Sequence, residues 1–356
     1  MSHRYEINAE TLQDCINFSL GLFNPLKGFM GSADYNSVVE HMCLADGNVW
    51  TIPLTLDVDY DTFMQAVAST RLTLTYNHKP VAYIDIEDCF QVDFEIDLKK
   101  VFKTSDIAHP GVAKESGRHQ YRIGGPITVT NKSLHNDALS PVKTKAFFDS
   151  KGWKTVAGFQ TRNPIHKAHE YLQRVALEQC EGLFINPLVG WKKVGDFSEA
   201  AVVDGYKAMI KEYYVDVNIH LDTLRTPMLY AGPREAIFHA IIRRNLGCTH
   251  FIIGRDHAGV GDYYGKYEAH ELANKIIKKY DLGIELLLLK EPFYCHKCAQ
   301  IVSENTCGHK AKYVEKISGT IIRDMLAQNK RPNELSMRAE VADAIIKLGK
   351  NKFIRS

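Results

Sequence analysis

The sequence predicts an α/β protein in which a strand-rich N-terminal region precedes a parallel sheet covered by helices. Two observations support this prediction. From Thr155 to Leu289, short apolar runs typical of buried strands alternate with amphipathic stretches typical of helices. Before residue 150, short runs of β-branched and aromatic residues are separated by Gly, Asn, Asp and Pro, without a long helical period between them. The two regions are therefore expected to be built differently.

Length and composition indicate a globular protein. The chain has 356 residues, of which 45% are hydrophobic and 24% charged, and this composition excludes an intrinsically disordered chain. Its length predicts roughly two or three domains. The 44 Lys and Arg residues barely exceed the 42 Asp and Glu residues, for a formal charge of +2. A dedicated nucleic-acid binder usually has a strong basic excess, so we expect no nucleic-acid partner.

Neither a membrane anchor nor secretion is expected. Leu286–Leu289 is an apolar run bounded by Glu285 and Lys290, whereas a membrane span needs about 20 apolar residues. Residues 1–6 contain no apolar signal core. The 8 Cys of the chain are too few for a disulfide scaffold. These features predict a cytoplasmic protein.

The N-terminal region, residues 1–150, is predicted to form a barrel-like domain. Its expected strands are Val49–Asp57, Arg71–Tyr76 and Val81–Ile86. No long helical segment is expected between them, so antiparallel or barrel-like pairing is favoured over a parallel sheet. Asp137–Asp149 is polar and contains a Pro, and we expect a linker there.

Residues 151–325 are predicted to form the α/β domain, and residues 326–356 a small helical C-terminal part. Strands that alternate with helices favour a parallel sheet, in which ligands bind beyond the carboxyl ends of the strands. The loops after Phe159 and Ile253 are therefore the expected sites of chemistry. The expected strands are Thr155–Phe159, Leu183–Pro187, Val215–Leu221, Cys248–Ile253 and Ile284–Leu289, and the expected helices are Ile165–Gln179, Asp196–Tyr213, Arg234–Asn245, Tyr267–Lys279 and Met337–Leu348.

The first candidate site is Gln160–His169, directly after a predicted strand. Pro164 suits an early helical position, and His166 and His169 would then share one face of the first turn. Backbone N–H groups and the dipole at a helix N-terminus favour an anion, and Arg162 can bind an oxyanion through two hydrogen bonds. The alternatives are two surface histidines or, less favoured at this spacing, a metal-binding pair.

The second candidate site is Gly254–Gly261, which follows another predicted strand and is rich in Gly. The Gly residues allow a close backbone approach, and successive N–H groups in such a loop can bind an anion. Arg255 and His257 add positive or titratable side chains. Alone, this loop could be an ordinary Gly-rich turn. Two such loops at strand ends of one sheet favour a shared site for a polyanion.

Motifs of several other enzyme classes do not occur. No Gly-x-Gly-x-x-Gly follows the first strand of the α/β domain, and the sequence contains neither Gly-x-x-x-x-Gly-Lys-Ser/Thr nor Gly-x-Ser-x-Gly. The sequence therefore argues against a standard NAD enzyme, a P-loop kinase and a Ser hydrolase with a nucleophile elbow.

Residues 293–312 contain a third feature, the pattern Cys-x2-Cys-x8-Cys-x-His, whose members are Cys295, Cys298, Cys307 and His309. Four such ligands complete a tetrahedral Cys3His zinc site, and a full set of protein ligands leaves no position for a substrate. We therefore expect a structural zinc that holds this loop together. The alternatives are free thiols, or His296 as the fourth ligand, although a ligand placed between the first two Cys would strain the site.

Several segments together carry a resemblance to a known family. In the N-terminal region they are Asn24–Met30, Leu44–Trp50, Ile52–Leu56 and His109–Val112. In the α/β region they are Phe159–His169, Pro187–Lys193, Tyr230–Glu235, Gly254–Gly261 and Ile317–Arg323. On these segments the chain resembles the ATP sulfurylase (sulfate adenylyltransferase) family, in the short form without a fused kinase domain. The resemblance covers nearly the whole chain.

The resemblance implies a barrel-like, PUA-like N-terminal domain, a Rossmann-like nucleotidyltransferase domain and a small C-terminal part. It also implies reversible adenylyl transfer between ATP and sulfate. A sulfate oxygen attacks the α-phosphorus in line, and the products are adenylyl sulfate (APS) and pyrophosphate. Mg²⁺ bound with ATP is the implied cofactor, and a homodimer is the implied assembly.

The resemblance further implies roles for single residues. Gln160, Arg162 and the backbone of Ala258 match sulfate ligands. The residues that match catalytic ones are Thr161, Arg162, Asn163, His166 and His169. The residues that match ATP-binding ones are Gln160, Thr161, Arg162, Asn163, His166, His169, Gly254, Arg255, Asp256, His257 and Val302. The residues that resemble the motif closing the nucleotidyltransferase core are Ser318, Gly319 and Thr320.

Two other functions are compatible with parts of the sequence. Related nucleotidyltransferases that adenylylate a phosphorylated small molecule share a similar His pair, although Gln160–Asn163 and the Gly-Arg-Asp-His loop argue against such an enzyme. The N-terminal resemblance suggests an RNA-binding module, which the formal charge of +2 disfavours.

Overall fold

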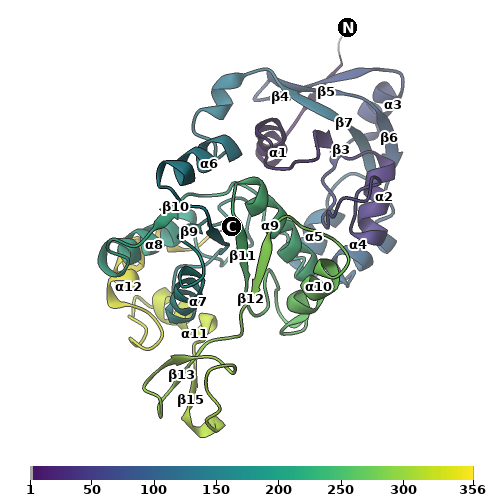
Figure 1. The fold of residues 1–356 in the computed structure, drawn as a ribbon. Coiled ribbons are helices and arrows are strands. Elements are labelled where there is room, and N and C mark those ends of the chain that lie inside the picture. Colours follow the sequence, from purple (N-terminus) through teal and green to yellow (C-terminus); the bar gives the residue numbers. More distant parts are fainter. Residues whose placement is uncertain (1–2, 356) are drawn as a thin grey trace. The chain divides into compact units, whose positions relative to one another are not determined.

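The computed structural model describes residues 3–355, whose course is drawn in Figure 1. These residues form two compact units, and the chain passes between the units several times. Unit 1 contains the chain up to Phe147, Thr226–Gly247 and Asp256–Ile284, and unit 2 contains Phe148–Arg225, Cys248–Arg255 and the chain from Glu285 onward.

Unit 1 is built on a mainly antiparallel sheet, in agreement with the sequence-based prediction. The long strand β7 (Tyr121–Val129) pairs antiparallel with four others, which are β5 (Lys79–Asp85), β2 (Gly28–Phe29), β3 (Leu56–Val58) and β6 (Asp88–Gln91). β5 also pairs antiparallel with β4 (Arg71–Tyr76), and β1 (Arg4–Glu6) joins β4 as a parallel strand. The strand predicted at Arg71–Tyr76 is therefore confirmed, and the one predicted at Val81–Ile86 lies in β5 apart from its last residue.

Helices that the sequence analysis did not place connect many of these strands, although no long helix separates the predicted ones. The helices are short, which hides their period in the sequence. Side chains of Asn8, Asp59 and Asp93 accept hydrogen bonds from first-turn N–H groups and fix where three of them begin. The helices of unit 1 are α1 (Ala9–Leu20), α2 (Ser32–His41), α3 (Tyr60–Val67), α4 (Phe94–Phe102), α5 (Pro110–Ser116), α9 (Pro233–Asn245) and α10 (Glu268–Ile277).

The predicted linker Asp137–Asp149 is mostly helix α6 (Pro141–Ser150), and the chain first passes from unit 1 to unit 2 within it, after Phe147. Pro is well tolerated at the first helical position, where its missing N–H has no helical partner to lose. The buried hydroxyl of Thr144 donates to the Leu246 carbonyl at 2.6 Å. Its polar residues thus belong to a packed helix rather than to a free connection.

The strand predicted at Val49–Asp57 is mostly a loop. Only its end enters β3, and a single bridge joins Val49 to Cys43. Pro53 interrupts the segment because its nitrogen cannot donate to a sheet ladder. The buried Thr51 instead donates its hydroxyl to the carbonyl of Arg234 in α9 at 2.5 Å.

Unit 2 is built on a parallel sheet, which confirms the prediction for this region. The strand order is β10-β9-β8-β11-β12, so β8, the first of these strands in the chain, lies between β9 and β11. The strand order reverses at the β8–β11 junction, the place where α/β sheets usually bind ligands. The strands are β8 (Val156–Phe159), β9 (Gly182–Ile185), β10 (Ile219–Leu221), β11 (His250–Ile253) and β12 (Glu285–Leu288), drawn in Figure 1.

The helices of unit 2 share one apolar core with this sheet. They are α7 (Lys167–Leu177), α8 (Glu199–Tyr213), α11 (Gly319–Ala327) and α12 (Ala339–Ile346). Leu183 and Ile185 of the sheet, Tyr206 of α8 and Val341 of α12 are all fully buried in it. The C-terminal helix therefore packs with α8 rather than standing alone. The helices predicted between residues 165 and 348 are confirmed, with ends shifted by a few residues.

A small antiparallel sheet, β14-β13-β15, extends from unit 2 in Figure 1. Its strands are β13 (Phe293–Cys295), β14 (Gln300–Val302) and β15 (Val314–Lys316). β14 packs against α7. Three short 3₁₀ turns, Lys132–His135, Ala311–Tyr313 and Gly349–Lys352, complete the described elements.

Within residues 3–355, no helix is long and apolar enough to cross a membrane. The domain boundaries that the sequence predicts near residues 150 and 325 remain predictions.

Candidate active site

The loop after β8 is held in a compact turn. Thr161 Oγ1 accepts the N–H of Asn163 and donates to the Asn163 carbonyl, both at 3.0 Å. The segment after β9 also fixes the loop, since the N–H of Leu188 donates to the Thr161 carbonyl at 2.9 Å. Thr161 is buried, whereas Gln160, Arg162 and Asn163 are partly exposed. These three side chains can therefore reach a ligand beyond the end of β8.

His166 lies just before helix α7 rather than inside it, which corrects the predicted helix start. Its backbone is extended, with φ −134° and ψ 174°, and its Nδ1 accepts the N–H of His169 at 3.4 Å. His166 is therefore the N-cap residue, and Pro164 lies outside the helix. The two imidazole rings stack with their centroids 3.8 Å apart, so the predicted pairing of the histidines is retained.

Both imidazoles are neutral at neutral pH. Burial lowers the pKa of His166 to about 4. Burial, and then the neighbouring His166, lower the pKa of His169 well below its ordinary value. Because Nδ1 of His166 accepts a hydrogen bond, the proton of this neutral ring lies on Nε2. The Nε2–H group of His166 is thus the donor that remains for a ligand.

Asp196 is a buried carboxylate surrounded by cations from three segments. Its side chain is 1% exposed. Arg162 Nε lies 3.7 Å from one carboxylate oxygen, and Lys193 Nζ and Arg323 Nη2 lie 3.6 and 3.8 Å from the other. Three cations share one carboxylate, so the cluster carries an excess of positive charge. The three cations are partly exposed, so this excess charge can be reached by a multiply charged anion.

Lys192 and Phe197 line the same region. Lys192 is 4% exposed and donates from Nζ to the Phe197 carbonyl at 2.7 Å. Burial lowers the pKa of Lys192 to about 8. The Arg323 guanidinium lies 5.6 Å from the centroid of the Phe197 ring, and its buried Nε has no hydrogen-bond partner among residues 3–355. A bound anion would supply the acceptor that this nitrogen lacks.

Helix α11 adds a second helix N-terminus to unit 2. Ser318 caps it, since its Oγ accepts the N–H of Ile321 at 3.3 Å. Gly319 and Thr320 are exposed at the start of the helix. Arg323 follows one turn later and reaches Asp196. The motif resembling the closing segment of the nucleotidyltransferase core is thereby linked to the cation cluster.

Val302 lies in a different part of unit 2. It is buried at the end of β14, and this strand packs against α7. Val302 thus belongs to a strand beside the helix that His166 caps.

The loop after β11 leaves the same edge of the sheet as the loop after β8, because these strands are parallel neighbours. Gly254 lies beside Leu172 of α7, where an added Cβ would approach a side-chain carbon to 3.5 Å. Arg255 Nη1 pairs with Glu291 Oε1 at 2.9 Å, and its side chain is half-exposed. The residues that follow, Asp256–Gly261, belong to unit 1. That these residues form one site with the loop after β8 remains a prediction.

Within unit 1, Asp256–Gly259 form a tight turn. Asp256 and Ala258 both have positive φ, 47° and 59°. A Cβ on Gly259 would lie 1.9 Å from the Asp256 carboxylate, so only Gly fits there. The Ala258 carbonyl accepts the N–H of Gly232 at 3.2 Å, while no residue described between 3 and 355 accepts the N–H of Ala258. This N–H can therefore bind an anion.

A buried chain of polar side chains supports His257. His257 Nε2 lies 3.3 Å from Nδ1 of His239, and His239 Nε2 lies 3.3 Å from Oε1 of Glu235. The Glu235 carboxylate also accepts the N–H groups of Leu229 and Ala231, both at 2.9 Å. These bonds hold Glu235 in place, and the contact with His239 sets the orientation of His257.

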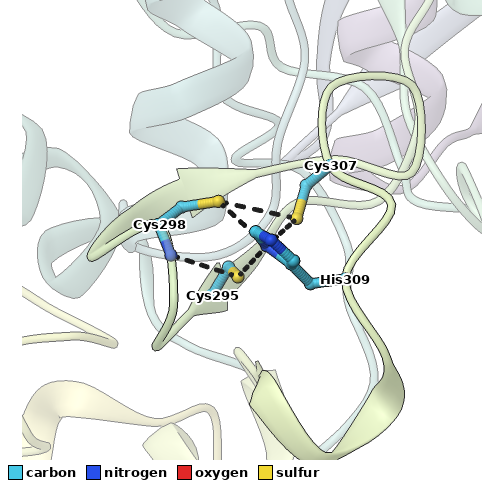
Figure 2. A group of neighbouring side chains, drawn as sticks. All are labelled: Cys295, Cys298, Cys307 and His309. Carbon is cyan, nitrogen blue, oxygen red and sulfur yellow. Dashed lines mark hydrogen bonds between the residues drawn. The ribbon is translucent and has the colours of Figure 1, made fainter.

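The four predicted metal ligands come together (Figure 2). One ligand atom from each of Cys295, Cys298, Cys307 and His309 lies within 4.8 Å of all the others. His309 Nδ1 is 3.3–3.4 Å from each sulfur, and the sulfurs of Cys298 and Cys307 are 3.7 Å apart. His296 is turned away and contacts Glu315 at 2.9 Å. The predicted choice of His309 over His296 thus agrees with the structure.

Two family models match the chain. The PUA-like domain model matches residues 2–132, and the ATP-sulfurylase model matches residues 136–348. The chain belongs to the ATP-sulfurylase family. This membership confirms both the family expected from the sequence and the predicted combination of a PUA-like region with an α/β nucleotidyltransferase fold.

Members of the family are similar to the chain over nearly its whole length. A sulfate adenylyltransferase of Hyperthermus butylicus is 46% identical, and the alignment covers 96% of this chain and 88% of the relative. The sulfate adenylyltransferase of Ignicoccus hospitalis is 45% identical over 96% of this chain and 89% of its own. The sulfate adenylyltransferase of Deinococcus radiodurans is 40% identical, and the alignment covers 97% of this chain and 89% of the relative.

A solved structure supports the fold. A hexameric APS kinase from Thiobacillus denitrificans superposes with a TM-score of 0.72 at 19% sequence identity. The superposition covers 98% of this chain and 63% of the other chain. At this identity the likeness concerns the fold alone.

The structure adds charged residues that sequence reasoning did not place in the ATP-sulfurylase site. Lys193 and Arg323 lie in segments that carried the family resemblance, but only the structure shows that they meet at Asp196. Glu235 and His239 were missed as well. Their spacing of four residues within one predicted helix is a signal that could have paired them.

Proposed function

We propose that this chain catalyses reversible adenylyl transfer between ATP and sulfate, with APS and pyrophosphate as products. The Asp196 cluster carries the proposal, because three cations around one carboxylate are suited to bring two anionic substrates together. Relatives named sulfate adenylyltransferase, at 40–46% identity over nearly the whole chain, support it.

In the proposed reaction a sulfate oxygen attacks the α-phosphorus of ATP in line. A bond forms between this oxygen and phosphorus. The bond from the α-phosphorus to the oxygen that bridges to the β-phosphate breaks, and its electron pair leaves with pyrophosphate. Sulfate is already ionised, so no general base has to remove a proton. Catalysis then consists of positioning the reactants and neutralising negative charge.

Sulfate is proposed to bind at the end of β8. Arg162 offers two parallel N–H donors, Gln160 offers its amide, and the Ala258 N–H is the third donor. Arg162 already lies 3.7 Å from Asp196, which prevents the guanidinium from swinging freely. The same Arg162, with Thr161 and Asn163, is proposed to act in the transfer step. The compact Thr161–Asn163 turn supports this assignment.

The ATP phosphates are proposed to bind at His166 and His169. The Nε2–H group of His166 can donate to a phosphate oxygen, and the dipole at the start of α7 favours the negative charge there. A hydrogen bond from a neutral imidazole grows stronger as charge builds on the phosphate, which favours the transition state. The other proposed contacts to ATP are from Gln160, Gly254, Arg255, Asp256, His257 and Val302.

Mg²⁺ is proposed to arrive with ATP and to neutralise phosphate oxygens. The nucleotide itself would then supply most of its ligands, as is usual for this ion.

The Cys3His cluster is proposed to hold a structural zinc. An ideal tetrahedral site with the usual bond lengths has sulfurs about 3.8 Å apart and sulfur–nitrogen distances of about 3.6 Å. The observed 3.7 Å and 3.3–3.4 Å fit these values. The Cys298 N–H also points to the Cys295 sulfur at 3.5 Å, a contact that stabilises a thiolate. With all four positions filled by protein, zinc would tie β13 to the following loop and take no part in adenylyl transfer.

The experiment that tests the proposed function is exchange of labelled pyrophosphate into ATP. We expect exchange only when both sulfate and Mg²⁺ are present. The rival function, adenylylation of a phosphorylated small molecule, predicts no stimulation by sulfate. Exchange that does not respond to sulfate would overturn the proposal.

Two variants sharpen this test. Arg162→Ala and His166→Ala should fold normally and lose at least ~100-fold in exchange rate, the size expected for losing an aligned charge-stabilising group. Arg225→Ala is the matched control, because Arg225 is exposed and pairs with Glu199 outside the Asp196 cluster. Near-normal exchange in Arg162→Ala would contradict the assignment of the sulfate site.

We also propose a cytoplasmic homodimer. Sedimentation at several protein concentrations tests the assembly, and fractionation of cells tests the location.

A further inference from the structure

Unit 1 contains a cavity of about 400 Å³ that the proposed reaction does not use. Residues from α1, α4, α5, β7 and the segment before α9 line it. One part of its wall is apolar and includes Ile52, Leu98 and Val101, all of which are buried. Another part carries charged and hydroxyl groups. A cavity of this size, with apolar and polar parts in its wall, can hold a small molecule.

Most charges on the wall have partners inside the protein. Lys114 pairs with Glu10, and Arg118 pairs with both Asp57 and Glu115. Tyr35 donates its hydroxyl to Asp97 at 2.7 Å. These groups are satisfied without a ligand.

Arg122 is an exception. It is 2% exposed, and no carboxylate within residues 3–355 lies at ion-pair distance from its guanidinium. Nη1 donates only to the carbonyls of His119 and Tyr121, and Nε has no hydrogen-bond partner among the same residues. Asp57 and Glu115 act on Arg122 electrostatically without reaching ion-pair distance, and its guanidinium lies 5.6 Å from the centroid of the Phe94 ring. A buried Nε–H without an acceptor is costly, and a ligand carboxylate would supply that acceptor.

Asp14 is the second exception. Its carboxyl group makes no hydrogen bond and no ion pair with any residue from 3 to 355. Burial raises the pKa of Asp14 to about 7, which reflects a carboxyl without a strong partner. A third wall group, the Thr226 hydroxyl, belongs to a residue that is 3% exposed and also lacks a partner within the described chain.

We propose that this cavity binds a small zwitterion, an amino acid, with its carboxylate at Arg122 and its ammonium group at Asp14. The two orphan groups have opposite charge and line one cavity, so a ligand with both charges satisfies both at once. Asp14 and Arg122 both line this cavity, as does Arg118. The apolar part of the wall receives the carbon chain of the ligand, and the Thr226 hydroxyl is a further polar contact.

The test uses the full chain and measures its melting temperature and binding heat. The zwitterionic probes are L-leucine and 6-aminohexanoate, and the single-charge probes are hexylamine and hexanoate. We expect at least one zwitterion to raise the melting temperature at about 1 mM, with neither single-charge probe doing so. Failure of both zwitterions, or equal binding of hexylamine or hexanoate, would overturn the proposal.

Variants locate the site. Asp14→Asn and Thr226→Val keep the shape of the side chain, and Asp14→Asn should weaken binding by at least ~10-fold because it removes the counter-charge of the ammonium group. Asp61→Asn, at the start of α3 and not on the cavity wall, is the control and should bind normally. Unchanged binding in Asp14→Asn would place the ligand elsewhere. The His166→Ala variant should bind the zwitterion normally, so this result is independent of adenylyl transfer.

Discussion

The carboxylate of Asp196 lies 3.7 Å from Nε of Arg162, and the same buried group also forms ion pairs with Lys193 and Arg323. Without this carboxylate, the three partly exposed cations would repel one another. The carboxylate therefore positions the cations before any substrate arrives, while leaving positive charge for the substrates.

Asp196→Asn tests this positioning role. We expect kcat/KM for sulfate to fall by at least ~10-fold, with most of the loss in kcat, because Arg162 is no longer held in the geometry of the transition state. Steady-state kinetics at varied sulfate and ATP give the split between kcat and KM. Glu199→Gln is the control, since Glu199 is an exposed acid that pairs with Arg225 instead. Normal kinetics in Asp196→Asn would show that the carboxylate is dispensable.

His166 makes the stability of the protein depend on pH. Its pKa is about 4 in the folded state and 6.5 when unperturbed. Between these two pH values the unfolded chain binds a proton at His166 and the folded chain does not. Its contribution is therefore complete above pH 6.5 and is lost as the pH falls toward 4. Each such group changes the free energy of unfolding by up to about 1.4 kcal/mol per pH unit in that range.

Denaturant unfolding at pH 7, 6 and 5 checks this expectation. Carboxylates also titrate as the pH falls, so the comparison is between the wild type and His166→Asn. The variant should lose less stability between pH 7 and pH 5 than the wild type does. Parallel stability curves for the two proteins would mean that His166 is not held neutral by burial.

His239→Gln tests the support of His257. We expect KM for ATP to rise several-fold and the folded state to persist, because His257 keeps its place in the loop but loses its fixed orientation. The NMR signals of the His257 ring should also shift, a readout that a purely structural role of His239 would leave unchanged. His220→Gln is the control, since His220 stacks on Phe184 in the sheet of unit 2. An unaltered ATP dependence and unaltered signals would contradict the support role.

Removal of the metal should destabilise the small sheet of unit 2. We expect about one zinc per chain after purification, and a drop of several degrees in melting temperature on chelation or in Cys298→Ser. Cys89→Ser is the control, because Cys89 lies in β6 and takes no part in the cluster. A protein purified without any transition metal, and with an unchanged melting temperature in Cys298→Ser, would exclude the zinc site.

The parallel sheet could be predicted from sequence because its strands are continuous apolar runs and its helices are long enough to show their period. α7 and α8 are examples. The helices of the first 150 residues could not, since seven to twelve residues stabilised by caps and tertiary contacts leave little periodic signal. α5 even begins with a His cap, His109, which is an unusual capping residue.

The candidate site was predictable only where its residues are close in sequence. His166 and His169, and the four metal ligands, could be grouped by spacing alone. Asp196 could not, because its partners Arg162 and Arg323 come from distant segments that only the folded chain joins. The predicted start of α7 was a few residues too early, because His166 is the N-cap residue of this helix and lies just before its first turn.

The strand β15 ends at Lys316, and Ser318 already caps the helix that carries Arg323. The hairpin that carries the proposed zinc ligands thus lies directly before the helix of Arg323, a residue of the Asp196 cluster. On the proposed function, shortage of trace metals or oxidation of the sulfurs would loosen this hairpin and the start of α11, and the rate of adenylyl transfer would fall although His166 and His169 are unchanged.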